Sequence, residues 1–230
     1  MLKFGWKLIK LRRVPKPNPY GLIDQNLLNC INNSSGILHL GAHRGSEAEV
    51  YNWFGKNVIW FEALPEIHDE LRDNLYFYKN QKSFLALLSD KDHKVTKFNV
   101  SNYDKACSSM FNFTEEIKKS KMWNNRKHKM IKTIKLKSIT LDTLLKNENI
   151  SSKDFNHWVL DLQGAELLAL KGSEESLKNC KSLHIEVSQR QFYDNGNLWL
   201  DIKTWLNERG FQNYKEPVMD EEDILFVRSI

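Results

Sequence analysis

The stretch Ile37–Pro65, ILHLGAHRGSEAEVYNWFGKNVIWFEALP, decides the fold. Its first four residues form a short, mostly apolar run of the kind that a buried parallel strand shows, and two glycines follow in the turn Gly41–Gly45. A second apolar run, Val58–Phe61, predicts another buried strand, and Glu62 comes directly after it, 21 residues beyond Gly41. In a βαβ unit of this kind, the glycines let the backbone approach a ligand and the acid can bind a ribose diol.

A helix is expected between these two strands. The residues from Ser46 onward fit a capping box, so we expect the helix to begin at Ser46 and to end at Gly55. Val50, Trp53 and Phe54 would form its buried face.

The composition indicates a folded globule. The chain has 230 residues, 41% of them hydrophobic, which suits one α/β domain with its own core. The net charge of +5 permits anionic ligands without implying nucleic acid. Three cysteines without a pairing pattern favour a reducing compartment, and hence a cytoplasmic protein, and argue against a cysteine-based metal site.

Residues 1–35 are expected to be an N-terminal arm, and residues 36–230 a single domain. The arm is basic and interrupted by three prolines, and it lacks the apolar length of a signal peptide or a transmembrane segment.

The rest of the chain alternates between strand and helix patterns. Expected strands are Ser83–Leu88, Lys94–Val100, His157–Leu160, Ser182–Val187, Phe211–Tyr214 and Ile224–Val227. Expected helices begin at Pro65, at Ile139, at Ala165 and at Leu198. In Lys94–Val100, every second residue from Thr96 to Val100 would lie on one face, so we expect an antiparallel strand outside the parallel core. We therefore predict an α/β fold with a Rossmann-like, doubly wound and mostly parallel sheet.

Polar residues follow five of the expected strands. In a doubly wound sheet, ligands bind at the carboxyl ends of the strands. By this rule, we expect one crevice to be surrounded by Gly41–Gly45, Glu62, Ser89-Asp90, Asp161–Gln163 and Glu186.

A basic tract, Lys118–Lys137, contains nine lysine and arginine residues. Such tracts are usually solvated loops or helix faces. Because this one is a basic insertion before the fourth core strand, it could also form a lid in which Arg126 and Lys127 hold the diphosphate of a nucleotide-activated sugar.

Several motifs resemble those of the FkbM family of S-adenosylmethionine-dependent methyltransferases, which have the class I methyltransferase fold. The motifs are Gly41–Gly45, Glu62–Pro65, Leu87–Asp90, Ser108-Ser109, Leu141-Asp142, Asp161–Glu166 with Leu170–Gly172, and Ile185–Val187. Together these motifs extend over about residues 36 to 228. Two positions depart from the common pattern, since His39 stands where many methyltransferases have an acid and His43 where many have glycine.

The resemblance implies an O-methyltransferase that acts on sugars or glycosylated products, in bacterial surface polysaccharide biosynthesis or secondary metabolism. It implies that Gly41 and Gly45 face the amino-acid part of the cofactor, that Glu62 holds the ribose and that Ser89-Asp90 lies near the adenine. The full expected cofactor set is Gly41, Ala42, Gly45, Glu62, Ser89, Asp90, Asp161 and Gln163.

Methyl transfer to a sugar hydroxyl benefits from a base, because the hydroxyl is a poor nucleophile. The catalytic candidates are Asp161, His43 and Glu186. Asp161 is best placed but could equally cap the following helix. Glu166 is a weaker candidate, since a carboxylate in the first turn of a helix is favourable anyway. Glu186 lies on an apolar strand, where burial without a partner is costly.

The acceptor is expected to contact Ser108, Ser109, Arg126, Lys127 and Tyr193, although packing is the simpler role for Tyr193. Asp161 and Glu186 could share a divalent ion, but we predict no metal. The expected partner is a small sugar or nucleotide sugar. We expect no nucleic acid, and the sequence is compatible with a homo-oligomer.

Two alternatives remain open at this point. The first is a Rossmann domain that binds the cofactor without catalysis, and the second, ranked lower, is a nucleic-acid methyltransferase. A nicotinamide dehydrogenase is disfavoured because G-x-x-x-G replaces G-x-G-x-x-G.

Overall fold

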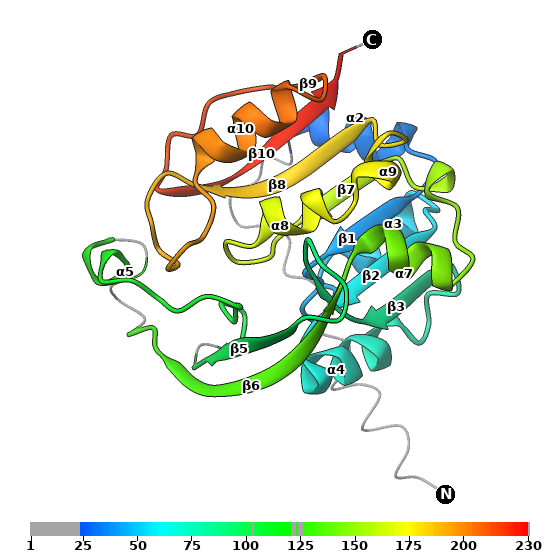
Figure 1. Ribbon diagram of the computed structural model, residues 1–230. Helices are drawn as coiled ribbons and strands as arrows, with labels where there is room; N and C mark the ends of the chain where they lie inside the picture. The colour runs from blue at the N-terminus through cyan, green and yellow to red at the C-terminus, as the bar shows by residue number, and fades with distance from the viewer. Residues whose placement is uncertain (1–23, 103, 121–122, 124–126, 230) are drawn as a thin grey trace, which may run out of the picture.

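Seven strands form the central sheet in the order β3-β2-β1-β7-β8-β10-β9 (Figure 1). The computed structural model describes residues 24–102, 104–120, 123 and 127–229. The strands are β1 (Ile37–Leu40), β2 (Val58–Glu62), β3 (Gln81–Leu85), β7 (His157–Leu160), β8 (Ser182–Ser188), β9 (Phe211–Asn213) and β10 (Glu221–Arg228). Neighbouring strands from β3 to β8 are parallel, whereas β10 is antiparallel to both β8 and β9. The predicted doubly wound, mostly parallel sheet is thereby confirmed.

Helices cover both faces of this sheet (Figure 1). The helices of the described chain are α2 (Gln25–Asn33), α3 (Ala48–Trp53), α4 (Pro65–Leu75), α5 (Glu116–Lys119), α7 (Leu141–Asn147), α8 (Glu166–Lys171), α9 (Glu174–Leu177) and α10 (Trp199–Asn207), with a 3₁₀ turn at Ser152–Asp154. Side chains of α7 to α10 pack on one face, and side chains of α2, α3 and α4 pack on the other. Helices are needed on both faces because β1 and β2 are buried along their whole length and need apolar partners on each side.

The chain order reverses between β1 and β7, because β1 leads outward to β2 and β7 leads outward to β8. Loops that follow β1 and β7 therefore diverge and leave room for a ligand at the carboxyl end of the sheet. The close register of Leu40 with both Phe61 and Leu160 brings the residues after all three strands together.

A second sheet of three strands extends from the main body, in the order β4-β6-β5 (Figure 1). Its strands are β4 (Leu87–Leu88), β5 (Val95–Ser101) and β6 (Met130–Ile139). The predicted antiparallel strand is confirmed in β5, which pairs with β6. Phe98, Ile134 and Leu136 pack against Leu64 and neighbouring residues at the start of α4, and this apolar contact joins the ribbon to the body.

Three expectations about individual elements were wrong. The first helix begins at Ala48, not at Ser46, and its buried residues are Ala48 and Tyr51, while Trp53 is 86% exposed. Ser46 does not cap the helix, because its hydroxyl donates to the carboxylate of Glu47 instead.

The run Ser83–Leu88 is not one buried strand. It contains the end of the edge strand β3, which is only partly buried, and the short strand β4, which belongs to the second sheet. The tract Lys118–Lys137 is not a loop, since its second half is strand β6 with Lys132, Lys135 and Lys137 exposed.

Within the predicted arm, residues 25–33 form α2, and Ile31 packs against the sheet. The boundary between residues 35 and 36 stays a prediction, and residues 1–23 of the arm lie outside the described residues. Among the helices that are described, none combines the length and apolar character needed to span a bilayer.

Candidate functional site

A cavity of about 210 Å³ opens at the carboxyl ends of β1, β2 and β7. The turn after β1 forms one side of it, residues after β2 and on β4 form another, and the turn after β7 forms its floor. The lining includes His39, Gly41, Ala42, His43, Glu62, Leu64, Leu87, Leu88, Phe98, Lys105, Ser108, Met110, Asp161 and Gln163. Most of the expected cofactor set therefore meets in one place.

The glycine turn lies against the neighbouring strand ends, and the backbone amides of three of its residues already donate hydrogen bonds within the protein. The amides of Gly41 and Ala42 both donate to the carbonyl of Phe61, and the amide of His43 donates to Glu62 Oε2 at 2.9 Å. Gly41 has φ of +86°, and a Cβ there would lie 1.8 Å from the carbonyl oxygen of Asp161. A turn whose amides are used internally does not cradle phosphates, but its bare backbone admits a ligand against it.

Glu62 lies at the end of β2 with both carboxylate oxygens in use. Besides the amide of His43, it accepts a hydrogen bond from the amide of Leu64 to Oε1 at 2.8 Å. Burial raises the pKa of Glu62 to about 7, and the backbone hydrogen bonds oppose that rise. Each oxygen keeps a further lone pair, so the side chain can still accept from the hydroxyls of a ribose.

The two residues expected near the adenine lie outside the cavity lining. Ser89 and Asp90 do not line the cavity, because the chain turns away after β4 and the hydroxyl of Ser89 donates to Asp90 at 3.2 Å. Leu87, Leu88 and Phe98 line the cavity at this position and form an apolar wall with Met110. A flat apolar wall of this kind suits a purine ring.

Gln163 makes hydrogen bonds to four other residues at the floor of the cavity. Its Nε2 donates to Asp161 Oδ1 at 2.5 Å and to Glu186 Oε2 at 2.7 Å. Its Oε1 accepts from the hydroxyl of Tyr193 at 2.5 Å, and its backbone carbonyl accepts from the hydroxyl of Ser109 at 2.8 Å. Gln163 adopts φ of +55°, a conformation that non-glycine residues rarely keep without a local reason.

Asp161 is one of the acidic residues that line the cavity, together with Glu47 and Glu62. Protein surrounds Asp161, yet its own surface is exposed on the cavity side. Burial raises the pKa of Asp161 to about 6, the hydrogen bond from Gln163 opposes that rise, and the nearby acids Asp223 and Glu47 add to it. Glu186 is partly buried behind it, and burial together with Asp161 raises its pKa well above the usual range.

Glu166 has a structural role. Its Oε1 accepts hydrogen bonds from the amides of Leu162 and Gly164, at 2.7 and 3.2 Å, and thereby braces the turn after β7. This agrees with the expectation that a carboxylate in the first turn of α8 serves the helix.

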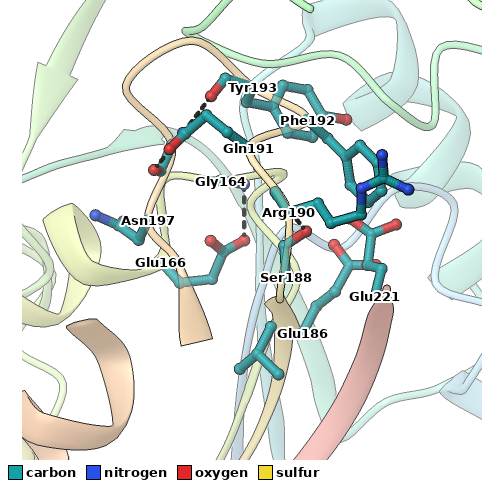
Figure 2. Close-up of a pocket in the computed structure, with 12 residues that line it drawn as sticks. Gly164, Glu166, Glu186, Ser188, Arg190, Gln191, Phe192, Tyr193, Asn197 and Glu221 are labelled. Carbon is teal, nitrogen blue, oxygen red and sulfur yellow. Dashed lines mark hydrogen bonds between the residues drawn. The ribbon is translucent and has the colours of Figure 1, made fainter. Parts of the chain in front are cut away.

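A second, much smaller pocket of about 10 Å³ lies behind the floor. Figure 2 shows Glu166 and Glu221 on either side of the segment that runs from Glu186 to Arg190. This space is close to the smallest that holds one water molecule. Three glutamates, Glu166, Glu186 and Glu221, line this pocket. Burial raises the pKa of Glu221 to about 8, which indicates that little water reaches these carboxyl groups.

His43 contacts a loop that covers the cavity. Its Nε2 lies 3.0 Å from the carbonyl oxygen of Asp104 and 3.0 Å from Arg44 Nη1. Arg44 pairs with Asp104 at 2.8 Å and with Glu70 at 2.5 Å. The imidazole therefore joins the glycine turn to the loop that follows β5, and because His43 also lines the cavity, its expected catalytic role stays a prediction.

The expected acceptor residues separate into three groups. Ser108 lines the cavity, and Lys127 is exposed at the start of the chain segment that leads into β6. Ser109 and Tyr193 are buried, and their hydroxyls are used on Gln163. Arg126 lies outside the described residues.

Sequence reasoning missed the lining contributed by Lys105, Ala106 and Met110, and it missed Glu221. The first three lie in an irregular segment with no periodicity that could have revealed them. Glu221 opens β10, and nothing in its neighbourhood distinguishes it from the acidic residues beside it. Within the described part of the chain, no group of three or more His, Cys, Asp or Glu side chains could hold a metal ion.

Comparison with known proteins gives a family match. Residues 39–212 match the sequence profile of the methyltransferase FkbM domain. No curated protein matches the chain significantly.

Solved structures of low sequence identity resemble the chain. Magnesium protoporphyrin IX methyltransferase (ChlM) from Synechocystis PCC 6803, with bound SAM, is 10% identical with a TM-score of 0.48, over 98% of this chain and 92% of that chain. A SAM-dependent methyltransferase from Aquifex aeolicus is 10% identical with a TM-score of 0.46, over 95% of each chain. A TehB-like SAM-dependent methyltransferase from Corynebacterium glutamicum is 11% identical with a TM-score of 0.44, over 89% of this chain and 86% of that chain.

Proposed function

The chain belongs to the FkbM methyltransferase family and is a SAM-dependent methyltransferase, and from this premise we propose that it methylates a hydroxyl group of a sugar, either nucleotide-activated or part of a glycan precursor. The observation that carries the proposal is the carboxylate of Asp161, which opens into the cavity beside the glycine turn. A hydroxyl acceptor must lose a proton as it is methylated, and an ionised aspartate at this position can accept that proton.

The residues of the cavity fit the cofactor part by part. Gly41 to His43 would lie against its amino-acid part, Glu62 would accept from its ribose hydroxyls, and the apolar wall at Leu87-Leu88 would contact its adenine. When bound, the cofactor supplies a methyl group on a positively charged sulfur. The chain's own part is then to align the acceptor with that methyl group and to keep water out.

Asp161 would remove the acceptor proton. Its pKa of about 6 keeps most of the side chain ionised at neutral pH while leaving it a stronger base than an exposed aspartate. Gln163 donates to Oδ1, which directs the remaining lone pairs of the carboxylate toward the cavity.

An anionic acceptor would find cations on the ribbon side of the cavity. Lys105 lines the cavity, and Lys127 is exposed on the segment that enters β6. Since Lys105 is already paired with Glu66 at 2.8 Å, Lys127 is the cation we assign to a phosphate of the acceptor.

The first test is mass spectrometry of products after incubation with the methyl donor and a panel of free sugars, nucleotide sugars and a short RNA. We expect one added methyl group on a sugar substrate. Asp161→Asn should lower kcat by about a thousandfold, because the amide cannot accept the proton, and should leave the Kd of the demethylated cofactor within about threefold. Methylation of the RNA alone would contradict the proposed acceptor class.

The second test concerns the phosphate contact. Lys127→Glu should raise the acceptor KM about tenfold for a nucleotide sugar and leave cofactor affinity unchanged. Lys146→Glu, an equally exposed position on α7, is the matched control and should change neither constant. Equal effects of the two variants would count against a contact at Lys127.

A further inference from the structure

Gln163 joins the carboxyl groups of Asp161 and Glu186. What this pair does depends on the proposed role of Asp161 as the base. Both groups accept a hydrogen bond from the same amide nitrogen, Asp161 at 2.5 Å and Glu186 at 2.7 Å. One nitrogen therefore holds the two carboxyl groups close together, and Asp161 helps to raise the pKa of Glu186. Two carboxylates this close repel each other when both are ionised, and a proton on one of them removes that repulsion and supplies a donor.

The orientation of the amide is set from the other side. Tyr193 is buried, and burial raises its pKa well above the usual range, so its hydroxyl keeps its proton. That hydroxyl has Gln163 Oε1 at 2.5 Å and the carbonyl of Cys107 at 3.3 Å, and its hydrogen can serve only one acceptor well. With Oε1 accepting from Tyr193, the Nε2 group must face the two carboxyl groups.

The cations near the pair already have acidic partners, and Lys105, which lines the same cavity, pairs with Glu66 at 2.8 Å. The charged groups that face the pair are acidic, namely Glu47 at the start of α3, Glu166 on α8, and Glu221 and Asp223 on β10. Arg190 lines the small pocket behind Glu186, but its guanidinium already pairs with Glu116 at 2.6 Å and Asp220 at 3.3 Å.

We propose that Asp161 and Glu186 share a single proton in the resting enzyme, carried on Glu186 and donated to Asp161, and that Tyr193 positions this pair through Gln163. Glu186 then acts as a neutral hydrogen-bond donor, and Asp161 alone is ionised toward the cavity. During transfer the acceptor O–H bond breaks as the new O–C bond forms and the S–C bond breaks, and the released proton passes to the free oxygen of Asp161.

The arrangement predicts unequal effects of two substitutions at one position. Glu186→Gln keeps a donor toward Asp161 and an acceptor toward Gln163, so it imitates the protonated acid and should lower kcat less than tenfold. Glu186→Leu removes both groups and should lower kcat at least a hundredfold. If Glu186→Gln lowered kcat as much as Asp161→Asn does, Glu186 would be an ionised base and the proposal would be overturned.

A measurement without substrate separates this proposal from the proposed function. Difference infrared spectra of the full chain at pH 7, wild type minus Glu186→Gln, should contain the C=O stretching band of one protonated carboxylic acid. Its absence would overturn the shared proton even if sugars are methylated. Its presence would support the shared proton even if the acceptor were of another class.

Tyr193→Phe tests the positioning role. The ring and its packing remain, but Gln163 Oε1 loses its donor and the amide can rotate. We expect kcat to fall about tenfold, with the cofactor Kd unchanged and the acidic limb of the kcat profile displaced from that of wild type. An unchanged kcat and an unchanged profile would remove Tyr193 from the proposal.

Discussion

Gly41 is the residue on which both the backbone geometry and the cavity at the carboxyl end of the sheet depend. Its φ of +86° lies in the region that glycine tolerates best, and a side chain would meet the Asp161 carbonyl at 1.8 Å. Gly55 provides a control, since it has φ of +63° but nothing lies within 4 Å of the position that a Cβ would take there. The two glycines thus share the conformation but differ in the space around them.

Gly41→Ala should therefore lower the free energy of unfolding by about 3 kcal/mol, the sum of an unfavourable φ and a backbone displacement. Gly55→Ala should cost about 1 kcal/mol, from φ alone. Urea denaturation of the two variants measures the difference. Equal losses would show that β1 and β7 can separate at Gly41 without a penalty.

At this scale, the sequence predicted residues that follow directly from strand ends and missed residues whose partners come from distant segments. Glu62 and Asp161 were found because each follows an apolar run of four residues. The hydrogen bonds of Ser109 and Tyr193 to Gln163 could not be predicted, because they join positions 54 and 30 residues apart. His43 was assigned to catalysis because its ring chemistry is visible in the sequence, whereas its contact with the Asp104 carbonyl is not.

Among the elements, the strands of the main sheet were the most predictable. Continuous apolar runs produced β1, β2 and β7, because only a strand buried on both faces uses such a run. The start of the short helix α3 was predicted two residues too early, and of its expected apolar face Phe54 packs against the core while Trp53 is 86% exposed. In β6, Ile134 and Leu136 alternate with Lys135 and Lys137, and the lysines obscured this strand pattern.

The loop between β5 and α5 contributes Lys105, Ala106, Ser108 and Met110 to the cavity lining, and Arg44 binds this loop. Arg44 reaches Asp104 in the loop and Glu70 on α4, while Lys105 pairs with Glu66 of the same helix. Asp104 and Lys105 both have positive φ, 48° and 61°, so the loop depends on its contacts to keep this shape.

Arg44→Ala should increase the dissociation rate of the cofactor about three- to tenfold, because the loop loses two contacts that hold it over the cavity. Partly exposed ion pairs contribute little to folding, so the free energy of unfolding should change by less than about 1 kcal/mol. Stopped-flow fluorescence measures the dissociation rate. Arg72→Ala, which removes an exposed ion pair with Asp69 on the same helix, is the control and should leave the rate unchanged.

On the scale of the whole molecule, buried ionisable groups cluster at the carboxyl end of the sheet and along one of its faces. Burial raises the pKa of Glu62 and Glu166 to about 7 and that of Glu221 to about 8. Burial also lowers the pKa of His39 and lowers that of His157 to about 3. The acids and the histidines have opposite effects on the pH dependence of folding.

The sign follows from proton uptake. Between pH 6.5 and 8.5 the folded chain keeps protons on these acids that the unfolded chain, with carboxyl pKa values near 4.5, has already released. Stability therefore falls as the pH rises through this range. The histidines oppose this change only in the lower part of the range, where unfolded imidazoles with a pKa near 6.5 still hold some protons that His39 and His157 in the folded chain do not.

We expect the free energy of unfolding of the cofactor-free protein to fall on the order of 2 kcal/mol between pH 6.5 and 8.5. Thermal denaturation in buffers of matched ionic strength measures this as a lower Tm at the higher pH. Glu221→Gln removes the acid with the highest of these pKa values and should make the fall smaller, whereas Glu115→Gln, on an exposed turn, should leave it unchanged. A Tm that rises between pH 6.5 and 8.5 would mean that these carboxyl groups are already ionised in the folded chain, and it would remove the electrostatic basis for a proton shared between Asp161 and Glu186.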